Sequence, residues 1–276
     1  RRPPRSTQSR SSAASDVYKR QVLYSMVNYE HLIVVAKEAA HKATQALVSM
    51  DDISLSYVYD DDLPREMKAE VDFKLEQIIL DALKSTEIPI LSEESSGFRK
   101  INKKGLCWLV DPLDGTVNFI RGIAPCAVSI ALWLDNKPVF GVISEYPSLR
   151  LAWGGSLFGA FIEDNPIHVS AIEDKSQAVL CTGFPSRLEF SKVSVDSFLN
   201  MASSFGKVRM LGAASISLLQ VAKGSTDAYF EEDIMIWDVA AGLAIIEGAG
   251  GNIKILPGHF QYSQKIIATN GLIQLE

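Results

Sequence analysis

The feature that most constrains this chain is the stretch WLVDPLDGTVNF at residues 108–119. An apolar run at 106–110 leads into two aspartates, Asp111 and Asp114, and a glycine and a threonine follow directly. The apolar run predicts a buried strand, and Asp-Gly after a proline is typical of a turn. Taken alone, the stretch fits an ordinary turn as well as a functional site, so the interpretation depends on the rest of the chain.

Acidic residues recur next to apolar segments, at Asp72, Glu93, Asp111, Asp114 and Asp238. Each has an ordinary explanation by itself, and Asp238, for example, fits the first turn of a helix. If the fold brings them together they repel one another, and bound divalent cations are the usual remedy. An all-oxygen ligand set suits Mg²⁺. A helix beginning at Thr116 would add free N–H groups suited to phosphate, so the sequence indicates hydrolysis of a phosphate ester.

The hydrophobic pattern predicts an α+β chain. Apolar residues at helical spacing predict helices at 27–50, 67–84, 192–204, 213–223 and 237–248. Short apolar runs predict strands at 88–91, 106–111, 126–134, 138–146, 150–154, 158–163, 178–182, 207–210, 226–231 and 251–256. We expect residues 51–64 to form a loop or a mobile hairpin. Strand-rich meanders joined to β-α-β units predict a layered α+β fold.

The first 21 residues differ in composition from the rest, because they are rich in Arg and Ser and nearly free of large apolar side chains. They lack the apolar core of a secretory signal, so we expect 1–21 to be a disordered or non-native leader. The remainder, 22–276, is predicted to be a single phosphatase domain with two α/β halves, roughly 22–165 and 166–276.

Charge and cysteine usage exclude several classes of protein. The net charge of −6 gives no sign of the basic face that a nucleic-acid polymer requires, and no apolar run reaches the length of a membrane span. Cys107, Cys126 and Cys181 lie in apolar runs without a C-x-x-C pair. We expect them to be buried free thiols in a reducing compartment, which favours a cytoplasmic location.

Three segments resemble the signature segments of the inositol monophosphatase family: Glu93-Glu94-Ser95, the D-P-L-D-G-T block at 111–116 and W-D-V-A-A-G at 237–242. This Mg²⁺-dependent, lithium-sensitive phosphatase superfamily also contains fructose-1,6-bisphosphatase and the bisphosphate nucleotidases. The similarity spans roughly residues 27–270. It implies a layered α-β-α-β-α sandwich, a homodimer, two or three Mg²⁺ ions and a small phosphorylated metabolite such as inositol monophosphate.

The resemblance also implies roles for individual residues. Carried over by position, the metal ligands would be Glu93, Asp111, the backbone carbonyl of Leu113, Asp114 and Asp238. Thr116 would orient the attacking water with Asp72 as its partner, and the N–H groups of Gly115 and Thr116 would hold the phosphate. Glu231 and the backbone near Ala214 would contact the substrate. The implied reaction is direct attack by a metal-activated water, without a covalent phosphoenzyme.

The sequence departs from the family before Asp72, where E-M-K-A-E-V at 66–71 replaces the usual Pro-Val-Thr. The acidic run at 60–62 also lacks a clear match to a lysine that many members carry. Lys68 could supply a replacement positive charge, although a surface lysine is the simpler interpretation. These differences leave the third metal site and the number of ions open.

The substrate also stays open at this point. Asn118-Phe119 after the threonine favours the inositol-phosphate branch. A 3′(2′),5′-bisphosphate nucleotidase is the main alternative, for which Phe184, Arg187 and Phe190 would supply aromatic and basic contacts. A histidinol-phosphate phosphatase on the same fold is a further possibility. A catalytically silent binding protein is disfavoured because no metal-site acid is missing.

Overall fold

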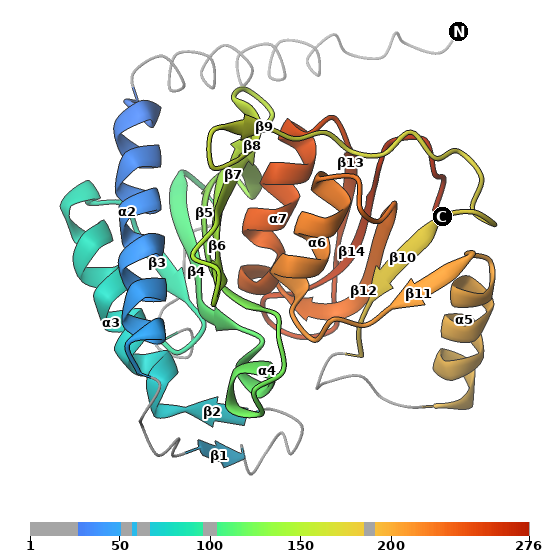
Figure 1. Cartoon of the computed structure of the whole chain (residues 1–276), viewed down its shortest axis with the longest axis horizontal. Helices are drawn as coiled ribbons and strands as arrows, with labels where there is room; N and C mark the ends of the chain where they lie inside the picture. The colour runs from blue at the N-terminus through green and yellow to red at the C-terminus, as the bar shows by residue number, and fades with distance from the viewer. Residues whose placement is uncertain (1–26, 51–56, 60–66, 96–103, 185–190, 276) are drawn as a thin grey trace, which may run out of the picture.

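Five alternating layers of helices and sheets make up the described part of the chain in the computed structural model (Figure 1). That part comprises residues 27–50, 57–59, 67–95, 104–184 and 191–275 of the 276. The layers confirm the predicted α-β-α-β-α sandwich. Helices α2 (Tyr29–Val48) and α3 (Glu70–Leu83) form the first layer, α6 (Ala214–Ala222) and α7 (Ile236–Gly248) the middle one, and α5 (Lys192–Ser203) the last.

The first sheet has seven strands in sequence order: β3 (Ile90–Ser92), β4 (Leu106–Asp114), β5 (Cys126–Leu134), β6 (Lys137–Tyr146), β7 (Leu151–Gly155), β8 (Gly159–Ile162) and β9 (Asn165–Pro166). The second has five, in the order β11 (Lys207–Arg209), β10 (Val179–Thr182), β12 (Ala228–Met235), β14 (Ser263–Thr269) and β13 (Asn252–Pro257). Short elements complete the fold: the pair β1 (Tyr57–Tyr59) and β2 (Met67–Ala69), the 3₁₀ turn η1 (Lys84–Thr86) and helix α4 (Thr116–Ile120).

Two hydrophobic cores flank the seven-stranded sheet because successive side chains of a strand point to opposite faces. On β5, Val128 and Ile130 pack toward α2 and α3, whereas Ala127 and Trp133 pack toward α6 and α7. Helix α7 is apolar around nearly its whole circumference, as expected for a helix covered on both sides by sheets. None of the helices in the described ranges is long and apolar enough to cross a membrane.

The structure corrects three details of the predicted elements. The helix expected at 67–84 begins only at Glu70, because Met67–Ala69 pairs with Tyr57–Tyr59 as an antiparallel strand. The strand Ser263–Thr269 was not predicted, although it pairs with both β12 and β13. Strand β4 does not end at Asp111 but continues to Asp114.

An irregularity in β4 lies where the site forms. Asp111 pairs with Ser129 of β5 and Asp114 pairs with Ala127, so three steps along β4 oppose two steps along β5. This is the geometry of a β-bulge, which locally bends a strand and redirects its side chains. The chain then turns at Gly115, whose φ is 89°, and enters α4.

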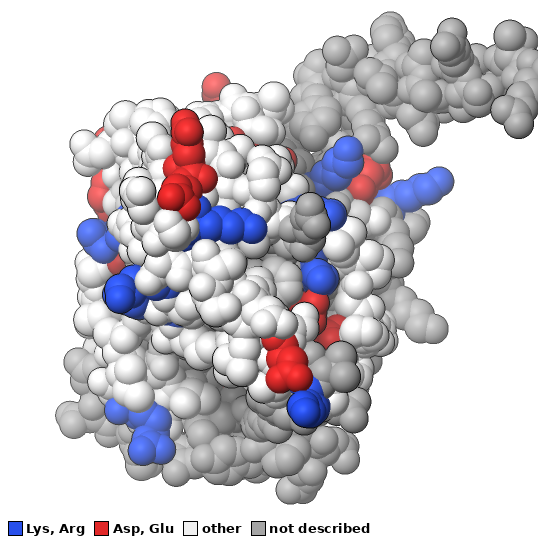
Figure 2. Space-filling view, turned by 90° about the vertical axis from the view of Figure 1, so that its right-hand side faces the viewer, with Lys and Arg blue, Asp and Glu red and all other residues white. Residues whose placement is uncertain are grey.

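The face on the right of Figure 1, where α5 and β11 lie, is shown in Figure 2. Lys and Arg side chains on it are interspersed with Asp and Glu. The described residues of this face thus form no broad patch of one sign.

Candidate metal and phosphate site

Three acidic side chains from separate elements meet beside the bulge. Glu93 follows β3, Asp111 lies on β4 and Asp238 lies in the first turn of α7, and each offers an oxygen within 4.8 Å of the other two. Burial holds the pKa of Asp111 well above its usual range, and the charges of Glu93, Asp114 and Asp238 raise this pKa further. A bound cation would offset this repulsion, and the all-oxygen donor set fits a hard cation such as Mg²⁺.

The DPLDGT sequence orients Asp111 through its own backbone. The N–H of Leu113 donates to Asp111 Oδ1 at 3.0 Å, the short-range hydrogen bond that aspartate often makes two residues along a turn. The Leu113 carbonyl accepts from Thr116 Oγ1 at 3.0 Å. These contacts hold a carboxylate, a carbonyl and a hydroxyl together at the bulge that ends β4, which is consistent with the ligand roles predicted for Asp111 and Leu113.

Asp114 makes hydrogen bonds that the sequence did not predict. Its carboxylate lies at the N-terminus of α6, where the N–H of Ala214 donates to Oδ1 at 3.1 Å and that of Ser215 to Oδ2 at 2.7 Å. The Ser215 hydroxyl also donates to Oδ2. Asp114 is therefore outside the 4.8 Å group of three acids, and its role as a metal ligand stays a prediction. Burial raises its pKa to about 6, although these hydrogen bonds act in the opposite direction.

The contact between Asp114 and α6 has a sequence signal in hindsight. The N-cap position of α6 is Ala213, which makes no side-chain capping bond. A helix whose own cap residue cannot accept hydrogen bonds often takes an acceptor from elsewhere in the fold. Asp114, one hundred residues earlier, is that acceptor.

Thr116 and Asp72 lie together, as the sequence analysis proposed. Thr116 Oγ1 is 3.4 Å from Asp72 Oδ1. Asp72 lies in the first turn of α3 and is buried, with 3% of its surface exposed. One turn later, buried Glu76 accepts the N–H of Ser95 at 3.2 Å, so α3 also anchors the turn that contains Glu93.

A cavity of about 260 Å³ lies next to the acids. Asp114, Asp238, Ala214 and Glu231 all line it, whereas Gly115 and Thr116 do not, so the structure brings two of the predicted substrate contacts and two of the predicted metal ligands to one space. Burial raises the pKa of Glu231 to about 7, with a further contribution from the charge of Asp114 and an opposing one from a hydrogen bond donated by Tyr229.

Sequence reasoning missed Asn118 as a structural link. The buried Asn118 side chain donates to the carbonyl of Pro125 at 2.7 Å and to that of Leu211 at 2.8 Å. Gly212 packs against it so closely that an added Cβ would lie 2.8 Å from Asn118 Oδ1. Asn118 thus joins the loop before β5 to the loop before α6, the two segments on either side of Gly115.

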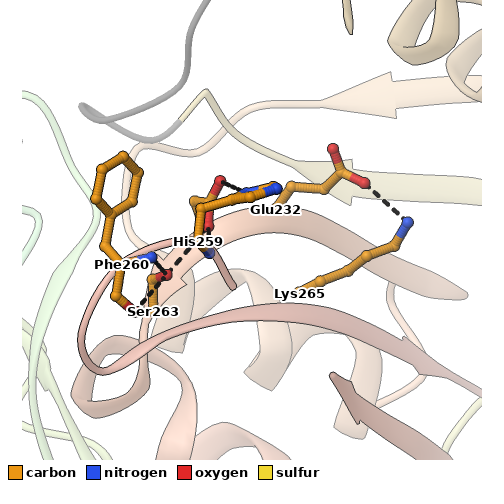
Figure 3. Close-up of polar contacts among 6 residues, drawn as sticks. Glu232, His259, Phe260, Ser263 and Lys265 are labelled. Atoms are coloured by element: carbon orange, nitrogen blue, oxygen red, sulfur yellow. Dashed lines mark hydrogen bonds and ion pairs between the residues drawn. The ribbon is translucent and has the colours of Figure 1, made fainter. Parts of the chain in front are cut away.

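A second polar cluster lies between the bulge of β12 and the turn that joins β13 to β14 (Figure 3). Strand β12 has a bulge after Glu231, and Asp233 there has a φ of 56°. Asp233 Oδ1 accepts the backbone N–H of His259 at 2.6 Å and the Ser263 hydroxyl at 3.0 Å, and Oδ2 lies 2.8 Å from His259 Nδ1. Nearby, Lys265 pairs with Glu232 at 2.8 Å. These contacts fix the β13–β14 turn against the bulge.

The remaining predicted features divide into two groups. All three cysteines are free and buried, as predicted. The acidic run at 60–62, Arg187, Phe190 and the side chain of Lys68 lie outside what the structure describes, as does the leader at 1–21.

The family model described as "Inositol monophosphatase family" matches residues 28–274. Among curated proteins, an inositol-1-monophosphatase of Synechocystis is 33% identical over 216 residues, covering 76% of this chain and 75% of that protein. A protein named Nus factor SuhB from Pseudomonas aeruginosa is 31% identical over 249 residues, covering 87% and 91%.

A comparison with solved structures agrees with these sequence matches. The crystal structure of the extragenic suppressor protein suhB from Bartonella henselae superimposes with a TM-score of 0.75 at 31% identity, covering 88% of this chain and 95% of that one. The fold, the order of the motifs and the sequence similarity therefore agree over nearly all of the described residues.

Proposed function

The chain belongs to the inositol monophosphatase family and is a phosphoric monoester hydrolase, and we propose that it releases phosphate from a small phosphorylated polyol or sugar, such as inositol monophosphate, in a Mg²⁺-dependent reaction. The observation that carries the proposal is the convergence of Glu93, Asp111 and Asp238 beside a cavity lined by Glu231. Three acids that meet around buried Asp111 repel one another unless a cation offsets their charge, and a polar cavity next to them provides room for the alcohol part of an ester.

The metal-binding part of the proposal assigns the ligands as Glu93, Asp111, the Leu113 carbonyl, Asp114 and Asp238. Support comes from the 4.8 Å grouping of three of these acids and from the hydrogen bond within the β4 bulge that orients Asp111. Asp114 can take part with either carboxylate oxygen while its hydrogen bonds to α6 fix its direction. Bound Mg²⁺ would acidify water and offset negative charge on the phosphoryl oxygens and the leaving alcohol.

In the proposed reaction, the chain's own groups position water and phosphate. The Thr116 hydroxyl lies between the Leu113 carbonyl and Asp72, so Thr116 can orient the attacking water while buried Asp72 accepts a proton through it. The N–H groups of Gly115 and Thr116, at the start of α4, would donate to the phosphoryl oxygens. Glu231 and the backbone at Ala214 would contact the substrate alcohol.

A nucleotide substrate is the second candidate, and one observation favours it. Phe184 lines the same cavity, is 43% exposed and lies 4.5 Å from the ring of Phe198, measured between ring centroids. An exposed aromatic side chain at a cavity is suited to stacking on a base. Relatives bear names both for inositol monophosphatase and for a Nus factor, so their names do not select one substrate.

We also propose a cytoplasmic homodimer. Three buried free thiols fit a reducing compartment. The expectation of a dimer comes from the family resemblance, and light scattering coupled to size-exclusion chromatography would test it directly.

The experiment that tests the proposed function is phosphate release from a panel of esters: inositol 1-phosphate, fructose 1,6-bisphosphate, histidinol phosphate and 3′-phosphoadenosine 5′-phosphate. Each would be assayed with Mg²⁺, with EDTA and with added Li⁺, beside Asp114→Asn. We expect turnover that requires Mg²⁺, prefers the inositol ester and is lost in the variant. Turnover that persists in EDTA and in Asp114→Asn would contradict the proposed site, and preference for the nucleotide would favour the second candidate.

A further inference from the structure

The carboxylate of Glu231 is held from two sides. Tyr229 lies two residues earlier on β12, on the same face of the strand, and its hydroxyl donates to Glu231 Oε2 at 2.6 Å. Only 1% of the Tyr229 surface is exposed, and its ring packs in the core between the sheets. A phenol fixed this firmly limits the positions that the carboxylate can take.

The other side is the backbone of Gly183. A Cβ added to Gly183 would lie 2.8 Å from both carboxylate oxygens of Glu231 and 3.0 Å from Cδ. Such distances are too short for a real contact, so only glycine allows the carboxylate to rest against the chain here. The end of β10 is itself fixed, because Thr182 Oγ1 donates to the Phe230 carbonyl at 2.6 Å.

We propose that Tyr229 and Gly183 form a clamp that fixes Glu231 as the acceptor for a hydroxyl group of the substrate alcohol, and that this clamp makes the enzyme select phosphate esters of polyols. The inference rests on the proposed function, since it specifies the selectivity of that same site. Tyr229 is a positioning residue in this account, and Gly183 determines specificity through the space that it leaves.

The geometry leaves one oxygen for the ligand. Within the described ranges, the only hydrogen bond to the Glu231 side chain comes from Tyr229 and uses Oε2. Oε1 can therefore accept a hydrogen bond in the cavity, which Glu231 lines together with Asp114 and Asp238. A carboxylate that is already fixed loses little conformational entropy when it binds a hydroxyl, and a buried acceptor left without a donor disfavours an alcohol that lacks one.

The first test compares two esters with Tyr229→Phe, which removes the phenol oxygen and keeps the ring. The esters are inositol 1-phosphate and p-nitrophenyl phosphate, whose leaving group has no further hydroxyl. We expect kcat/KM for inositol 1-phosphate, divided by kcat/KM for p-nitrophenyl phosphate, to fall about tenfold, which is the usual effect of losing one hydrogen bond to a charged group. The fall should come mainly from a higher KM for the inositol ester. Tyr29→Phe, at a buried tyrosine of the other core, is the matched control and should leave the ratio unchanged.

A double-mutant cycle tests the other side of the clamp. Gly183→Ala should lower the same ratio in the wild-type background, because its Cβ displaces the carboxylate. In a Glu231→Ala background there is no carboxylate for the added Cβ to displace. Gly183→Ala should therefore change the ratio less than twofold in that background. Circular dichroism and thermal unfolding would show that each variant folds.

These assays distinguish failure of the clamp from failure of the proposed function. If Tyr229→Phe lowers turnover of both esters equally, or of neither, the clamp does not set selectivity. The clamp is also wrong if Gly183→Ala acts equally with and without the Glu231 side chain. Wild-type enzyme that hydrolyses neither ester with Mg²⁺ would overturn the proposed function and the clamp together.

Discussion

Asp111 is buried and surrounded by the negative charges of the other site acids. It is 2% exposed, it lies within reach of three other carboxylates, and its pKa is raised by burial and by their charges. A raised carboxyl pKa means that the folded, metal-free protein gains stability as the pH falls and loses it as the pH rises through that pKa. Without a cation, the cost of ionising buried Asp111 therefore lowers the stability of the fold at pH values above the ordinary carboxyl range.

Replacing Asp111 with Asn should therefore have opposite effects with and without metal. The amide oxygen can still accept the N–H of Leu113, and the buried charge is removed. We expect the metal-free variant to be more stable than wild type by about 1–3 kcal/mol at neutral pH, with a smaller gain at acidic pH. Saturating Mg²⁺ should stabilise wild type by about 3 kcal/mol at a hundredfold excess over Kd and the variant hardly at all. Chemical denaturation with EDTA or Mg²⁺ measures both, and a variant that is less stable without metal would contradict this account.

Gly115 is a second residue at which a small substitution should change both stability and activity. Its φ is 89°, and an added Cβ would lie 3.1 Å from Cys126 Cβ and 3.2 Å from Ala213 Cβ. We expect Gly115→Ala to lower the free energy of unfolding by about 2–4 kcal/mol, combining backbone strain with overpacking, and to reduce activity by shifting Thr116.

Gly105→Ala is the matched control for that prediction. Gly105 has nearly the same φ, 93°, but no atom lies within 4 Å of the added Cβ. This variant should show only the strain of about 1–2 kcal/mol and should keep its activity. Equal losses of stability in the two variants would show that crowding at Gly115 has no effect.

Individual elements differ in how far the sequence predicts them, and local pairing explains the difference. Strands β5 and β6 were predicted almost to the residue because their apolar runs are long and Asp135-Asn136 ends the first. The sequence of β14, SQKIIAT, mixes polar and apolar residues, and it becomes a strand only through pairing with β12 and β13. Likewise Met67–Ala69 continues a helical pattern, and its pairing with β1 overrides that pattern.

The site shows the same limit. The acids stood out because they lie next to apolar segments, and the family resemblance implied that Asp72 would be the partner of Thr116. The motifs could not show that Asp114 would point to α6, or that Tyr229 and Gly183 would enclose Glu231, because these contacts depend on packing between distant segments.

The β13–β14 turn permits a pH prediction. Asp233, which burial alone would make less acidic, has its pKa lowered by hydrogen bonds from His259 and Ser263 and by the charge of His259. A hydrogen bond and the charge of Asp233 raise the pKa of His259 above 6.5. The stability due to His259 is therefore present below about pH 6.5 and lost as the pH rises through its folded pKa, while that due to Asp233 is lost only as the pH falls below about 3.8.

We expect His259→Gln to lower the melting temperature at about pH 5.5 and to have a smaller effect at about pH 9. The His259 side chain is largely exposed, so the difference is modest and should shrink in high salt. His168→Gln, at a histidine on a different loop, is a suitable control. A difference that is independent of pH would mean that the imidazole charge does not contribute.

At the scale of the whole molecule, the two α/β halves share their core. Helix α7 comes from the C-terminal half and packs on β5, β6 and β7 of the N-terminal half. Gly141 of β6 approaches it so closely that an added Cβ would lie 2.3 Å from the Ala241 carbonyl oxygen. We therefore expect residues 22–276 to behave as one domain that unfolds cooperatively.

Gly141→Ala tests this cooperativity. The added methyl group cannot fit against the backbone of α7, so we expect a loss of about 3 kcal/mol or more. Trp108 lies in the core beneath α2 and α3, and Trp133 and Trp237 lie in the core around α6 and α7, so tryptophan fluorescence monitors both cores. If they unfold together, it should report one transition. Circular dichroism should give the same midpoint, and two separate transitions would show that the halves unfold independently.

The position of α7 in the middle layer also bears on how the chain matures at the ribosome. The face of the seven-stranded sheet that packs on α6 and α7 is completed by residues 236–248, which follow all seven of its strands in the sequence. Until they emerge, a nascent chain that has already formed β3 to β9 exposes the apolar surface that α7 later covers. Stalled or truncated chains ending before residue 236 should therefore bind chaperones and aggregate, whereas chains that include residues 236–248 can cover this surface and fold.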